Sequence, residues 1–145
     1  MTGFKILSTI DEIELRKYPI SSQTVIVGDL FQLAIGATTW TACTSATVHY
    51  TRKVIAYQAA TSSASEFLGY EVRGNEVVEA ECGSTTAAAA DNGDRMVLTD
   101  KNTVNNSHTD STAKEAVFIQ YGVGSDTTHI VGRLIVGSGV NPDAT

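Results

Sequence analysis

Short runs in which apolar and polar residues alternate follow one another along most of this chain. Alternation with a period of two is typical of a β-strand with one buried face, because successive side chains point to opposite sides of a sheet. Turn signals rich in glycine, serine and asparagine separate the runs, and no long helical pattern is present. We therefore predict an all-β fold: a compact small barrel or sandwich of short strands with an extended N-terminal arm. The strands are expected within residues 23–36, 39–59, 65–83, 95–99, 115–123 and 129–137.

The clearest pair of predicted strands flanks Gly74 and Asn75. A Gly-Asn pair between two alternating runs is typical of a two-residue hairpin, which predicts that residues 67–73 and 76–82 pair with each other. In the second run, Glu79 and Glu81 fall on one face and small apolar residues on the other. This alternation predicts one wet face, and glutamates in that position commonly keep an edge strand soluble.

The first 19 residues differ from the rest because they combine closely spaced charges with apolar residues. Thr9 and Glu12 have the spacing of a helix capping box, whereas the residues from 13 to 16 alternate as in a strand, and both interpretations stay open. Pro19 cannot donate a ladder hydrogen bond, so a boundary is expected there. We predict an N-terminal arm at 1–19, a single β-domain at 20–137 and a loose C-terminal tail at 138–145. The candidate partner-binding residues of the arm are Phe4, Ile6, Leu7, Ile10, Ile13 and Leu15.

Composition and charge narrow the range of partners. The 145 residues suffice for one domain with its own core, and the net charge is −6 with a pI near 4.9. Nucleic acid is not expected as a partner, because binding phosphates takes clustered Lys and Arg. No secretory signal and no apolar run long enough to span a bilayer are visible, so we expect no membrane association. Cys43 and Cys82 are expected to be two reduced thiols, which suits assembly in a reducing cytoplasm.

The polar segment 100–110 is the most suggestive candidate for chemistry, since it holds a serine, a histidine and several Asp and Asn residues. It lacks the ligand spacing of an EF-hand loop, although an irregular calcium site stays open. Ser107, His108 and Asp110 lie too close in sequence for a catalytic triad to be inferred from them. We interpret the segment as a loop between two strands whose Asp and Asn side chains bond the backbone of their own turns.

No other pattern predicts an active site. His49 and His129 lie in strand patterns, and three histidines and two cysteines without close pairing do not predict a zinc site. The glycines form neither a phosphate loop nor a dinucleotide fingerprint. We therefore expect no enzyme activity, no cofactor and no metal. Trp40 with Tyr50 and Tyr57 could form an aromatic platform for sugars, although packing across a sheet is the commoner role of such residues.

Residues 24–44 resemble the start of small head-decoration (cement) proteins of tailed bacteriophages. In those proteins a Val-x-Val-Gly-Asp-Leu stretch opens a compact β-domain, and the matching residues here are Val25, Val27, Gly28, Asp29 and Leu30. Residues 94–106 and 116–136 are similar to the second half of some phage capsid-associated proteins. The chain departs from the family where residues 53–56 read Lys-Val-Ile-Ala in place of a Gly-Val-Ala strand, and in its highly charged N-terminal arm.

The resemblance implies a structural virion protein, commonly a homotrimer, on the outer surface of the expanded capsid. Such a protein assembles in the host cytoplasm and stabilises the shell by bridging subunits of the major capsid protein. As a hypothesis, residues 1–15 lie extended on a coat subunit, add main-chain hydrogen bonds to a sheet edge and place their apolar side chains in pockets.

Three alternatives to the decoration protein remain. A carbohydrate- or receptor-binding β-module of a virion would need Trp40 and neighbouring tyrosines exposed on one surface. A small hydrolase would need His108 or His129 beside a nucleophile and a carboxylate in a pocket. Another virion β-protein, such as a tail-tube component, would have much the same composition.

Overall fold

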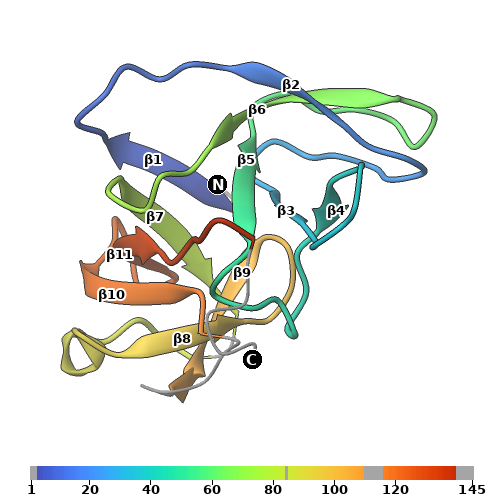
Figure 1. The fold of residues 1–145 in the computed structure, drawn as a ribbon. Coiled ribbons are helices and arrows are strands. Elements are labelled where there is room, and N and C mark those ends of the chain that lie inside the picture. The colour runs from blue at the N-terminus through green and yellow to red at the C-terminus, as the bar shows by residue number, and fades with distance from the viewer. Residues whose placement is uncertain (1–2, 84, 110–115, 140–145) are drawn as a thin grey trace.

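Two curved β-sheets make up the structure (Figure 1). The computed structural model describes residues 3–83, 85–109 and 116–139, in which eleven strands and one short 3-10 turn are found and no α-helix. The predicted all-β class is confirmed: five strands close into a small barrel, and the second sheet forms a half-barrel. Within the described ranges no helix is long and apolar enough to cross a membrane.

The barrel closes through a parallel pair of strands. Its order is β7–β11–β10–β8–β9, and β9 returns to β7 by pairing Glu81 with Thr103 and Cys82 with Val104. All its other pairings are antiparallel, and one further strand, β1, lies on the edge of β7. The strands of this sheet are β1 (Phe4–Ser8), β7 (Val77–Cys82), β8 (Arg95–Leu98), β9 (Thr103–Thr109), β10 (Phe118–Val123) and β11 (His129–Leu134), and η1 (Ala89–Asp91) precedes β8.

The half-barrel is antiparallel throughout, in the order β2–β6–β5–β3–β4. It lies above the barrel in the view of Figure 1. Its strands are β2 (Arg16–Pro19), β3 (Leu30–Leu33), β4 (Thr41–Ala42), β5 (Arg52–Ala56) and β6 (Glu66–Glu71).

Two hydrophobic clusters form the core, and the larger one draws residues from both sheets. The alternation of the strands produces them: in β11, for example, Ile130 and Leu134 point inward and are fully buried. The larger cluster joins inward residues of the barrel to Leu30 and Ile55 of the half-barrel, and its other members include Phe4, Val78, Met96, Leu98, Val104, Phe118, Ile130 and Leu134. The smaller cluster includes Tyr18, Ile20, Val25, Phe31, Trp40, Val54 and Phe67.

The predicted hairpin around Gly74 is wrong, because the strands on either side of it belong to different sheets. β6 pairs with β2 and β5, whereas β7 pairs with β1, β11 and β9. Residues 72–76 therefore carry the chain from the half-barrel to the barrel. The wet edge predicted for Glu79 is also wrong, since β7 is flanked on both sides and Glu79 is buried, with Oε2 accepting from the amide of Ser125 at 2.8 Å.

The predicted loop at 100–110 is mostly strand β9. Val104 is fully buried in the core, and Asn106 is buried with its amide oxygen accepting from the Thr85 N–H at 3.1 Å and its nitrogen donating to the Thr85 carbonyl at 2.9 Å. An asparagine at an inward position interrupts the apolar alternation, so the sequence pattern conceals this strand. The predicted role of Asp100 is confirmed: its Oδ1 accepts from the Asn102 and Thr103 amides.

The N-terminal segment contributes a strand to each sheet. β1 pairs with β7 from Phe4 opposite Ala80 to Ser8 opposite Val77, and β2 pairs with β6 of the half-barrel. Residues 9–15 connect them and contain no helix, which excludes the capping-box interpretation. In Figure 1 this connection arches along the upper left of the molecule.

The Gly-Asp pair of the 25–30 motif joins the two sheets. Gly28 has a φ of +94°, a conformation that glycine adopts without steric cost, and its carbonyl accepts from the Phe4 N–H at 2.9 Å. Asp29 is buried, with Oδ2 accepting from the Ile26 N–H at 3.0 Å and lying 3.2 Å from the Lys101 ammonium. The motif thus links β1, β3 and the connection between β8 and β9.

Candidate functional site

The connection between β1 and β2, residues 9–15, presents exposed apolar side chains; we call it the Ile10 loop. Ile10 is 82% exposed, which is the highest value among the large hydrophobic residues of the described chain. Ile13 and Leu15 of the loop, and Leu7 near the end of β1, are 40–47% exposed. Isolated exposed apolar residues are ordinary, but several close together commonly mark an interaction surface.

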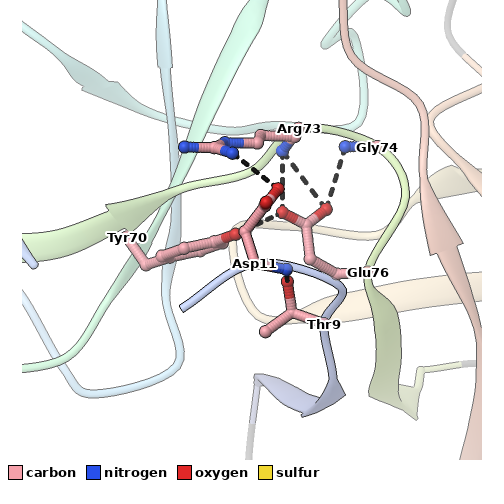
Figure 2. A network of polar contacts seen from close by, with 6 residues as sticks. All are labelled: Thr9, Asp11, Tyr70, Arg73, Gly74 and Glu76. Atoms are coloured by element: carbon pink, nitrogen blue, oxygen red, sulfur yellow. Dashed lines mark hydrogen bonds and ion pairs between the residues drawn. The ribbon is translucent and has the colours of Figure 1, made fainter. Parts of the chain in front are cut away.

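A polar network anchors the Ile10 loop to the connection between the sheets (Figure 2). Asp11 Oδ2 accepts from Arg73 Nη1 at 2.6 Å, and the Asp11 N–H donates to Thr9 Oγ1 at 3.3 Å. The backbone of Arg73 is itself fixed, because its N–H donates to Glu76 Oε2 at 2.9 Å. One half-exposed ion pair, between Asp11 and Arg73, thus ties the loop to the connection between β6 and β7.

Glu76 is the centre of this network. Its carboxylate is buried and accepts from the amides of Arg73 and Gly74 and from the Tyr70 hydroxyl, the last at 2.6 Å. Gly74 has a φ of +94°, so the turn that aims these amides at the carboxylate requires glycine. Burial, together with the hydrogen bond to Glu76, raises the pKa of Tyr70 to about 12, so the phenol stays protonated and continues to donate.

Replacing Glu76 by glutamine should destabilise the fold by about 1–3 kcal/mol, because the side-chain NH₂ cannot accept from the buried donors. Urea unfolding measures this change. Glu66→Gln is the matched control, since Glu66 is exposed and makes only a 3.5 Å pair with Lys17. Equal free energies of unfolding for the two variants would contradict a structural role for the network.

Two of the six predicted partner-binding residues lie in a different environment from the other four. Phe4 is only 2% exposed and belongs to the barrel core, and Ile6 is partly buried against that core. Phe4 is therefore corrected from a partner anchor to a core residue in this conformation. Ile6 and Phe4 instead line an apolar pocket beside β1.

The aromatic platform expected by the sugar-binding alternative is not formed. Trp40 is 3% exposed, packs edge-on against Tyr18 with ring centroids 5.1 Å apart, and is covered by the guanidinium of Arg52 at 5.4 Å. Tyr50 and Tyr57 are half-buried on other parts of the chain. The stacking surface that sugars would need at Trp40 is occupied by the protein's own side chains.

His129 forms a compact turn rather than part of an open site. Its Nδ1 lies 2.7 Å from Asp126 Oδ1, to which the Thr128 hydroxyl also donates at 2.6 Å. The hydrogen bonds from His129 and Thr128 hold the pKa of Asp126 well below its usual range.

The neighbouring Cys82 is a poor nucleophile, because burial and surrounding carboxylates raise its pKa to about 11. The side chains of His108 and Asp110 lie outside the described residues.

Lys53 is fully buried, which its place in the sequence pattern does not predict. Its ammonium donates to the Val48 carbonyl at 3.0 Å and to the carbonyl and hydroxyl of Thr51 at 3.1 Å, and no carboxylate of the described chain lies within ion-pair distance. Burial lowers the pKa of Lys53 to about 8, and burial also raises the pKa of the free Cys43 thiol to about 12. A lysine in an alternating strand gives no signal that separates burial from exposure.

The polar groups outside the Ile10 loop are thus committed mainly to the fold itself. In the described ranges no group of three or more His, Cys, Asp or Glu side chains is placed to hold a metal ion. The arrangement that stands out is an apolar, acid-flanked loop that is tied by Asp11 to Arg73, whose backbone is bound by the buried carboxylate of Glu76. Comparisons of the chain with family models, curated proteins and solved structures find no match.

Proposed function

We propose that this protein is a structural virion protein that binds the outer surface of the expanded capsid of a tailed bacteriophage. In this role it bridges subunits of the major capsid protein, as a homotrimer assembled in the host cytoplasm, and needs no catalysis or cofactor. The observation that carries the proposal is the Ile10 loop, a preorganised surface of exposed apolar side chains. The resemblance of residues 25–30 to head-decoration proteins supports the same assignment.

Preorganisation matters for such a role. A loop that is already ordered loses little conformational entropy when it binds, so more of the contact free energy becomes affinity. Many copies on one lattice would add their weak contacts through a high effective concentration. The exposed anchors in this proposal are Leu7, Ile10, Ile13 and Leu15, while Phe4 stabilises the strand that precedes them.

We expect Ile13→Asp combined with Leu15→Asp to weaken binding to expanded capsids at least roughly thirtyfold, because a central anchor contributes about 2 kcal/mol or more. Co-sedimentation across a range of protein concentrations measures the change. Ile35→Asp is the matched control: Ile35 is 64% exposed in the connection between β3 and β4, away from the loop. Wild-type affinity in the double variant would exclude the loop as the capsid-binding surface.

A further inference from the structure

The apolar pocket beside β1 is not filled by the chain's own side chains. It has a volume of about 490 Å³, within the range of roughly 300–1,000 Å³ typical of binding pockets. Val27, which is 54% exposed, stands at its edge, and Lys5 projects from β1 beside it. The lining residues are Phe4, Lys5, Ile6, Val27, Gly28, Ala56 and Tyr57.

The same chain carries a side chain suited to this pocket. Ile10 is exposed at 82%, so it does not occupy the pocket of its own molecule. The ion pair of Asp11 with Arg73, at 2.6 Å, ties the loop to the connection between β6 and β7, and Ile10 beside it points into solvent. Because the exposed side chain and the open pocket are both apolar and lie on the same protein, the side chain of one copy can fill the pocket of another.

Charge supports the same pairing. Within the described residues Asp11 is paired with Arg73 and Glu14 with Arg16, whereas Glu12 makes no ion pair. Lys5, at the pocket, likewise has no ion-pair partner among the described residues, although Glu79 lies opposite it on β7. A loop carrying an unpaired carboxylate is complementary to a pocket that carries an unpaired ammonium.

We propose that the Ile10 loop of one copy docks into the β1 pocket of a second copy, with Glu12 facing Lys5. Such a contact is either reciprocal, with each loop in the pocket of the other copy in a twofold dimer, or head to tail, in which case copies form a ring where the rotation closes. A loop seated in a second copy is not available to a coat subunit. The free protein therefore keeps its most exposed apolar side chain covered, and capsid binding exchanges this contact for one with a coat subunit, so other contacts hold the homotrimer together on the capsid.

Sedimentation velocity of the protein alone, from low micromolar to submillimolar concentration, tests this proposal. Wild type should associate, and both Ile10→Asp and Val27→Asp should weaken association more than about tenfold, each from one side of the contact. Ile35→Asp, at an aliphatic residue whose exposure of 64% lies between those of Val27 and Ile10, should associate as wild type does. Circular dichroism and thermal melting show that each variant is folded.

A charge exchange gives the sharper readout. Glu12→Lys alone should weaken association, because it places two cations together, and the addition of Lys5→Glu should restore it. The proposal is overturned if the wild-type protein stays monomeric over this concentration range. It is also overturned if Ile10→Asp or Val27→Asp associates as strongly as wild type, or if adding Lys5→Glu to Glu12→Lys does not restore association. All these results are obtained without capsids, so they are independent of whether the protein decorates one.

Discussion

Replacing Phe4 by alanine is expected to lower the free energy of unfolding by about 3–5 kcal/mol, the usual cost of removing a buried phenylalanine. Phe4 is 2% exposed, packs in the barrel core and donates its N–H to the Gly28 carbonyl at 2.9 Å. Loss of its ring would leave a cavity where β1 meets β7 and the 25–30 motif. The effect is large because β1 is an integral strand of the barrel sheet.

Equilibrium unfolding in urea measures this change, and Leu7→Ala is the control. Leu7 lies on the same strand but is 47% exposed, so its truncation should change stability by no more than about 0.5 kcal/mol. Similar small losses in the two variants would mean that β1 detaches readily from the barrel. That outcome would restore the free N-terminal arm that the sequence predicts.

Lys53 is expected to make stability depend on pH in an unusual direction. Its pKa is about 8 in the folded protein, against about 10.4 in an unfolded chain, because burial disfavours the charged amine. Between these values the unfolded chain binds a proton that the folded protein does not, so this residue makes the fold more stable as the pH rises. Its contribution should grow by about 3 kcal/mol across that window.

The difference between wild type and Lys53→Met measures this contribution. Cys43 and Cys82 act in the opposite direction, since their raised pKa values favour the folded protein at lower pH. Because the charge of Lys53 also lowers the pKa of Cys43, the same pair is compared in a Cys43→Ala background. Urea unfolding at intervals from pH 7 to 10 should show the stability of wild type rising relative to the variant. Lys17→Met, at an exposed lysine, should show no such trend. If the difference in free energy of unfolding between wild type and Lys53→Met does not change with pH, Lys53 does not have the lowered pKa that its burial implies.

Alternation along the sequence located most strands but not their partners. β8, β10 and β11 fall where the pattern predicts them, because their inward positions are filled by apolar residues such as Met96, Phe118 and Leu134. The hairpin at Gly74 was predicted from a local turn signal, yet the turn is organised by the buried carboxylate of Glu76, and the strands beside it pair in separate sheets. Strand pairing depends on residues distant in sequence, which local patterns do not encode.

For the candidate site, too, the sequence pattern indicated some features and did not show others. Apolar residues among charges at the N-terminus correctly indicated a segment with exposed hydrophobic side chains, four of which are on the surface. The pattern did not show that Phe4 is enclosed or that Arg73, some sixty residues away, anchors the loop through Asp11. Burial of Lys53 and Asn106 was equally hidden, because polar residues satisfied by distant backbone groups have the same local signature as exposed ones.

The central claim is that the protein binds expanded capsids, and the most direct test is co-sedimentation of the wild-type protein with expanded, undecorated phage shells beside unexpanded shells. We expect saturable binding to the expanded shells alone, together with increased resistance of those shells to heat. Absence of binding to either shell would contradict the claim.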